Sequence, residues 1–93
     1  MKKKIAILGS TGSIGKSLIN IIKKDKKNFD VILLSANNNT NELLKQVKLF
    51  NVKNIIITNK DKFDLTKKML IKKKINIYND FKSIEKIFKN KKI

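Results

Sequence analysis

The glycines of this chain lie together in one short segment, where the sequence first indicates chemistry. Gly9, Gly12 and Gly15 are the only three glycines among 93 residues, and they fall within seven positions. Gly9 would let the chain turn off a strand, Gly12 would let the backbone approach a phosphate, and Gly15 would let a following helix pack closely. The spacing predicts a loop that binds a nucleotide phosphate; a plain tight turn between a strand and a helix is the alternative.

The polar residues between the glycines, and the helix predicted to begin there, support the same chemistry. A helix that begins here would offer free N–H groups and a partial positive charge to a pyrophosphate. Ser10, Thr11 and Ser13 would add hydroxyl donors beside it. The tripeptide at 15–17, Gly-Lys-Ser, resembles the end of a P-loop, but that motif needs a glycine at position 10, which is serine. The spacing G-x-x-G-x-x-G is instead related to the dinucleotide-binding fingerprint.

A turn rich in asparagine follows the second apolar run and would form the other half of such a site. In NAD-binding proteins a carboxylate at this point holds the ribose 2′-hydroxyl. Here the residues are Asn37, Asn38 and Asn39, so no carboxylate repels a 2′-phosphate, and amide groups would donate to it. The turn favours NADP over NAD. The alternative is a polar loop in which Asn39 caps the next helix, with Glu42 three residues on as a capping pair.

Short apolar runs alternate with segments of helical period along the whole chain. The runs predict strands at residues 5–8, 29–35, 55–57 and 75–78. The periodicity predicts four helices with these inward residues: Ile14, Leu18, Ile21 and Ile22; Leu43, Val47 and Phe50; Leu65, Met69 and Leu70, after an Asp61 cap; and Phe81, Ile84 and Phe88. Strands that are apolar on both faces indicate an α/β fold with a Rossmann-like parallel sheet and helices on both sides. We expect one domain over residues 1–93, incomplete at its C-terminal end.

The composition excludes several kinds of catalytic and metal site. The chain has no cysteine and no histidine, which excludes disulfides, thiolate zinc sites, cysteine nucleophiles and the usual general base. The seven acidic residues are scattered and form no pair or cluster. We therefore expect no catalytic residue and no metal ligand within this chain.

The formal charge of +16 comes from lysine alone, because the chain has no arginine. The lysines are spread along the sequence, which favours a solvated surface over a nucleic-acid face; a basic nucleic-acid-associated protein remains a less favoured hypothesis.

The longest apolar run, residues 31–34, is far shorter than the roughly 20 residues of a membrane span, and no export signal is visible. We expect a cytoplasmic protein.

Residues 4–15, Lys-Ile-Ala-Ile-Leu-Gly-Ser-Thr-Gly-Ser-Ile-Gly, resemble the amino terminus of the 1-deoxy-D-xylulose 5-phosphate reductoisomerases. The resemblance continues through residues 29–39 and 41–44 and weakens to a general pattern after residue 53. It covers essentially the whole chain but only the first part of a family member, which is about four times longer. A stand-alone nucleotide-binding module without catalysis is the alternative.

The resemblance implies a cofactor site and a reaction. The implied NADPH contacts are Thr11, Gly12, Ser13, Ile14, Asn37, Asn38 and Asn39. The family often has Gly and a Lys or Arg where this chain has Asn37 and Asn38. The implied enzyme rearranges 1-deoxy-D-xylulose 5-phosphate and reduces it to 2-C-methyl-D-erythritol 4-phosphate, on the non-mevalonate route to isoprenoids. It uses Mg or Mn bound by a later domain, and it is a homodimer; this chain alone would be inactive.

Overall fold

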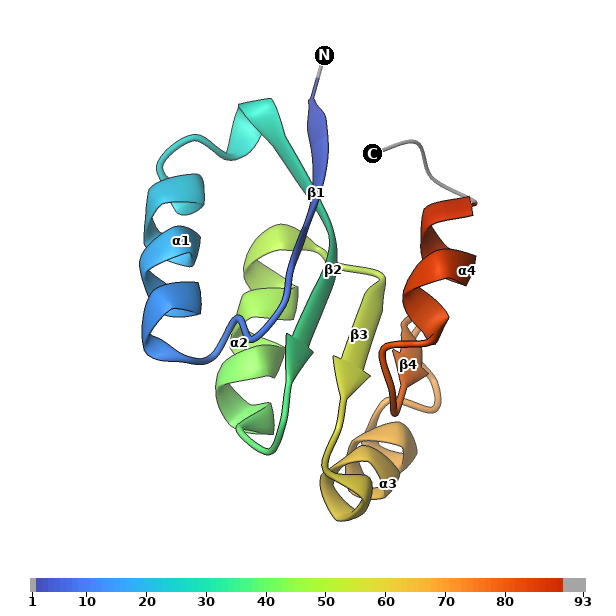
Figure 1. Ribbon diagram of the computed structural model, residues 1–93. Coiled ribbons are helices and arrows are strands. Elements are labelled where there is room, and N and C mark those ends of the chain that lie inside the picture. Colours follow the sequence, from blue (N-terminus) through green and yellow to red (C-terminus); the bar gives the residue numbers. More distant parts are fainter. Residues whose placement is uncertain (1, 90–93) are drawn as a thin grey trace.

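The computed structural model describes residues 2–89, which form a four-stranded parallel sheet flanked by helices (Figure 1). The strands are β1 (Lys3–Ile7), β2 (Phe29–Ala36), β3 (Asn54–Ile57) and β4 (Asn76–Tyr78). The helices are α1 (Ser13–Lys23), α2 (Thr40–Phe50), α3 (Lys60–Met69) and α4 (Ser83–Lys89), and a 3-10 turn, η1 (Lys26–Asn28), precedes β2. This architecture confirms the expected α/β fold with a Rossmann-like sheet.

The strand order β1-β2-β3-β4 decides which helices cover which face. Because successive right-handed crossovers step in one direction, α1, α2 and α3 lie on the same face of the sheet. Their core is the larger one and includes Ile19, Leu43 and Leu34, with Phe63 of α3 packed against it. After β4 the chain crosses to the other face of the sheet, which α4 covers. There Ile87 packs on β2 and β3. In Figure 1, α1 and α2 lie on one side of the strands and α4 on the other.

An irregularity in the pairing of β1 with β2 changes which β2 side chains face each core. Ile5 pairs with Val31, but Ala6 pairs with Leu33, so Ile32 is an extra residue in β2. Ile32 and Leu33 consequently both lie in the α4 core, although they are consecutive. Every residue from Val31 to Ala36 is buried. The strand is thus covered on both faces, as its continuous apolar run indicates.

The face of α1 that meets the sheet differs from the predicted one. The helix buries Gly15, Ile19 and Ile22, at spacing i, i+4 and i+7. Of the predicted inward residues, only Ile22 is buried; Ile14, Leu18 and Ile21 are exposed. The prediction used only the spacing of apolar side chains. The observed contact depends on Gly15, which has no side chain. A glycine lets the helix backbone approach, and this sets the rotation of the whole helix.

Helix α3 also begins and packs differently from the prediction. Its N-cap is Asn59, whose side chain accepts the Lys62 N–H at 3.0 Å, so Asp61 lies in the first turn instead of capping it. With this start the residues that reach the core are Phe63, Thr66 and Leu70, while Leu65 and Met69 are exposed. Leu70 is the only predicted inward residue of α3 that packs against the core.

The remaining elements follow the predictions closely, with small shifts at their ends. Helix α2 buries Leu43 and Val47 and packs Phe50 against the same core. The strand predicted at 5–8 begins two residues earlier, at Lys3, and ends one residue earlier, at Ile7, so Leu8 lies exposed in the turn after it. At α4, Phe81 precedes the helix and is exposed, Ile84 packs against the core, and the buried residue that the prediction missed is Ile87. The Phe88 side chain lies outside the described part.

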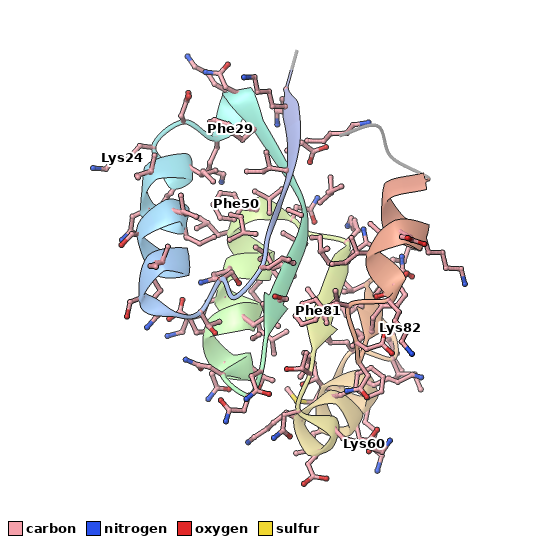
Figure 2. All side chains as sticks on the ribbon, viewed as in Figure 1. Lys24, Phe29, Phe50, Lys60, Phe81 and Lys82 are labelled. Carbon is pink, nitrogen blue, oxygen red and sulfur yellow. The ribbon has the colours of Figure 1, made fainter. Side chains whose placement is uncertain are left out.

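The lysine side chains project from several sides of the molecule. Figure 2 shows Lys24 after α1, Lys60 in α3 and Lys82 before α4, all pointing away from the sheet, and all three are exposed.

Over residues 2–89, no helix combines the length and the apolar character that crossing a bilayer requires.

Burial in the larger core predicts a stability difference between two leucines on neighbouring helices. Leu43 in α2 is fully buried, whereas Leu65 in α3 is 57% exposed. Leu43→Ala should lower the free energy of unfolding by about 2–5 kcal/mol, because it removes buried methyl groups and leaves a cavity. Leu65→Ala is the matched control and should change stability by less than about 0.5 kcal/mol. Urea unfolding followed by circular dichroism measures both, and equal effects would contradict the assigned packing.

Candidate nucleotide-binding site

The glycine loop leaves β1 and is held against the end of β2 by Ser35. The Gly9 N–H donates to the Ser35 hydroxyl at 2.7 Å, and the Ser10 N–H donates to the Ser35 carbonyl at 2.9 Å. Gly9 has φ +67°, in the left-handed region that favours glycine, and its carbonyl accepts the Gly12 N–H at 3.0 Å. The loop is a tight turn whose position is fixed relative to the second strand.

The two later glycines of the loop serve different purposes. A Cβ atom on Gly15 would lie 2.2 Å from the Gly9 carbonyl oxygen and 2.7 Å from the Ser10 Cα. The start of α1 therefore packs directly on the backbone of the turn, which only glycine permits. A Cβ atom on Gly12 would meet only the Gly9 carbonyl oxygen, at 3.5 Å, so no contact within the protein requires a glycine at position 12.

Ser10 does not face a ligand, contrary to the prediction from sequence. Its side chain is fully buried, and its hydroxyl donates to the Ser35 carbonyl at 3.3 Å. Its own carbonyl accepts the Gln46 Nε2–H at 2.9 Å, which ties the loop to α2. The sequence analysis missed Gln46. The available signal was a polar residue within the buried stripe of an otherwise amphipathic helix, beside Val47.

No side chain caps the amino end of α1, in contrast to α2 and α3 on the same face of the sheet. Its N-cap is Gly12, which provides no side-chain hydrogen bond, and no acidic residue lies in the first turn. Asn39 and Asn59 cap α2 and α3 through their side chains. The first N–H groups of α1 are thus left for water or a ligand, with the positive end of the helix dipole behind them.

The predicted loop residues are accessible at this helix end. Gly12, Ser13 and Ile14 are exposed, and Thr11 is half-buried. Ile14 is 81% exposed, although it is apolar and lies in the first turn of the helix. An apolar side chain so fully exposed beside free N–H groups is consistent with a surface that a ligand would cover.

The asparagine turn follows β2 at the same edge of the sheet, since β1 and β2 are parallel neighbours. Asn37, Asn38 and Asn39 are all exposed. Asn39 accepts the Glu42 N–H at 3.4 Å, which confirms its capping role, and the Asn37 carboxamide oxygen accepts the Thr58 hydroxyl at 2.9 Å. Ser35, two residues before this turn, holds the glycine loop, so both predicted halves of the site are brought to one edge.

The charged groups within residues 2–89 provide no metal site. No set of three or more histidine, cysteine, aspartate or glutamate side chains gathers there to hold a metal ion. The one ion pair in this part of the chain joins Lys60 of α3 to Asp64 one turn later, at 4.0 Å on the exposed surface. The site therefore offers backbone N–H groups, hydroxyls and amides, which are ligands for an anion.

The contrast between Gly12 and Gly15 gives a direct test of the loop geometry. Replacing glycine by alanine inside a helix ordinarily stabilises it by about 1 kcal/mol. Gly15→Ala should instead lower the free energy of unfolding by about 1–3 kcal/mol, because the new methyl group overlaps the backbone of the turn. Gly12→Ala, the matched control, makes no such overlap and should lower stability less, by about 0.5–1 kcal/mol, because alanine is a poorer N-cap than glycine. Thermal melts of the two variants measure this, and a Gly15→Ala chain as stable as the parent would contradict the close packing.

The sequence matches a family model over residues 5–93, that of 1-deoxy-D-xylulose 5-phosphate reductoisomerase. A relative of that name from Pelagibacter ubique is 57% identical over 86 residues, which cover 92% of this chain and 22% of the relative. Another from Buchnera aphidicola is 45% identical over 73 residues, covering 78% of this chain and 18% of the relative. The chain thus spans about a fifth of the length of these curated relatives.

A solved structure shows the same fold over nearly the whole chain. It is the 1-deoxy-D-xylulose 5-phosphate reductoisomerase from Zymomonas mobilis in complex with NADPH. The match has a TM-score of 0.81 and 25% sequence identity, and it covers 94% of this chain and 23% of that structure. Together with the glycine loop and the parallel sheet, these matches show that the chain belongs to the 1-deoxy-D-xylulose 5-phosphate reductoisomerase family.

Proposed function

We propose that this chain binds NADPH at the carboxyl edge of β1 and β2. The observation that carries the proposal is the uncapped amino end of α1, which lies behind a glycine loop that Ser35 fixes in place. Free N–H groups at the start of a helix, with the positive end of the helix dipole behind them, bind phosphate well. The NADPH complex of the Zymomonas mobilis relative, which shares this fold, supports the same assignment.

The pyrophosphate would lie against the glycine loop. A Cβ atom on Gly12 would meet one backbone oxygen and no side chain, so a phosphate could approach the backbone there. Thr11 and Ser13 carry hydroxyl donors on either side of it. Ile14 would lie beside the cofactor and lose apolar surface to it. These residues fit a dinucleotide, and the bound cofactor would supply the hydride for a reduction.

The adenosine ribose and its 2′-phosphate would lie on the asparagine turn. Asn37 and Asn38 are exposed and carry no negative charge. Asn39 uses its carboxamide oxygen to cap α2, which leaves its amide hydrogens available as donors. A 2′-phosphate has only acceptors and a negative charge at neutral pH, so amide donors suit it and carboxylates would repel it. This supports a preference for NADPH over NADH.

The activity that we propose for the whole enzyme is the rearrangement of 1-deoxy-D-xylulose 5-phosphate and its reduction to 2-C-methyl-D-erythritol 4-phosphate. The residues of this chain would bind and orient the cofactor only. The described residues do not fit the divalent metal that the family uses, and we assign no catalytic residue among them. The catalytic groups, the metal ligands and the phosphosugar site would belong to the rest of a polypeptide about four times longer, which we expect to be a cytoplasmic homodimer.

Gly12→Val tests the proposed cofactor site without disturbing the fold. Gly12 has φ −78° and ψ 174°, an extended conformation that valine adopts readily. The branched side chain would fill the space in front of the loop and block the pyrophosphate. We expect NADPH affinity to fall by more than about 100-fold, or about 2.7 kcal/mol.

Isothermal titration calorimetry of the 93-residue chain with NADPH measures this effect. Ile21→Val is the control, since Ile21 is exposed on α1 about two turns from the loop and should keep the parental affinity. A circular dichroism spectrum confirms that each variant is folded. Unchanged affinity in a folded Gly12→Val chain would contradict the assigned site.

A further inference from the structure

The asparagine turn is held from the third strand as well as from its own. After β3, the Thr58 N–H donates to the Ala36 carbonyl at 3.1 Å, and the Asn59 N–H donates to the Asn37 carbonyl at 3.0 Å. The Thr58 hydroxyl then donates to the Asn37 carboxamide oxygen at 2.9 Å. The backbone and the side chain of Asn37 are therefore both fixed by the two residues that follow β3.

The Thr58 hydroxyl is paired with the oxygen end of the Asn37 carboxamide, so the NH₂ end is the one that remains free. A carboxamide has an oxygen that accepts and an NH₂ group that donates. Because the oxygen is engaged by Thr58, the NH₂ group keeps both of its hydrogens for another acceptor. Asn37 is exposed, whereas Thr58 is half-buried, so the fixed end lies toward the protein and the donor end belongs to the accessible part of the turn.

Thr58 is itself held firmly enough to orient a neighbour. The Asn79 amide, just after β4, donates to the Ile57 carbonyl at 2.9 Å and to the Thr58 carbonyl at 3.4 Å. On the other side, Asn59 begins α3 as its N-cap. A donor attached to a backbone that is anchored on both sides loses little entropy when it binds, which strengthens its effect on an exposed side chain.

We propose that Thr58 is a specificity-determining positioning residue, which orients the Asn37 amide so that its Nδ2–H groups donate to the 2′-phosphate of NADPH. The inference rests on the proposed NADPH function and extends it to a residue outside the two predicted loops. Without the Thr58 hydroxyl, the Asn37 carboxamide would turn freely and present its oxygen to the phosphate part of the time. NADH has a hydroxyl at this position, which both donates and accepts and so pairs with either end of the amide; its binding would depend little on Thr58.

Thr58→Val and Thr58→Ser separate the hydroxyl from the shape of the side chain. Valine keeps the branched shape but removes the donor, and serine keeps the donor. Thr58→Val should weaken NADPH binding by about three- to tenfold, the effect of one hydrogen bond, and leave NADH binding within about twofold. Thr58→Ser should restore the preference of the parent. Titration of the 93-residue chain with NADPH and with NADH gives the ratio of the two dissociation constants.

A double-mutant cycle with Asn37→Ala shows whether Thr58 acts through Asn37. Once the carboxamide is gone, Thr58→Val should have no further effect on NADPH affinity, so the two losses should not add. A general disturbance of the turn would instead lower the affinity for both nucleotides and persist in the Asn37→Ala background. Melting curves of all variants identify any loss of folding.

The outcomes distinguish this inference from the proposed function beneath it. If the parent chain binds neither nucleotide, the NADPH proposal is overturned and this inference with it. If it binds both equally, the proposed preference for NADPH is overturned, and this inference with it, while the binding site itself stands. If the parent prefers NADPH and Thr58→Val keeps that preference, this inference alone is overturned, and the preference comes from the diffuse lysine charge or from Asn38 and Asn39.

Discussion

Three hydrogen bonds from the glycine loop to Ser35 fix that loop against the end of β2, and the arrangement of the candidate site depends on this contact. Ser35 is buried at the end of β2, and it accepts the Gly9 N–H through its hydroxyl and the Ser10 N–H through its carbonyl. A glycine-rich turn loses much conformational entropy on ordering, so it needs such partners to hold one conformation. Ser35 lies two residues before the asparagine turn. It therefore links the glycine loop directly to the other half of the proposed site.

The close packing of α1 on the turn has a consequence for the surface of the helix. Since Gly15 lies against the Gly9 carbonyl and the Ser10 backbone, α1 is rotated so that Ile19 and Ile22 meet the sheet. This rotation leaves Ile14, Leu18 and Ile21 exposed. The helix therefore has more apolar positions than one face can bury. The backbone contact between Gly15 and the turn therefore determines the rotation of α1, even though this rotation leaves three apolar side chains exposed.

The fold class and the position of the glycine loop between β1 and α1 were predicted better than the inward faces of the helices. Continuous apolar runs identified the strands, and the glycine spacing identified the loop, because both signals reflect local requirements of the backbone. The inward faces of α1 and α3 were predicted wrongly, since they depend on a close approach at Gly15 and on a cap at Asn59. Gln46 and Thr58 were missed, because their hydrogen bonds join residues 36 and 21 positions apart.

The two halves of the proposed site differ in how strongly the fold constrains them. At the glycine loop the donors are backbone N–H groups, and their geometry follows from Gly9, Gly15 and Ser35 whatever the exposed side chains are. At the asparagine turn the donors are side chains, which can be replaced without changing the sheet. The proposed pyrophosphate site would therefore depend on the backbone architecture, whereas the proposed discrimination at the ribose would depend on a few exchangeable residues. If the asparagine turn binds the 2′-phosphate as proposed, its selectivity depends on neighbours such as Thr58, which holds the Asn37 amide in one orientation.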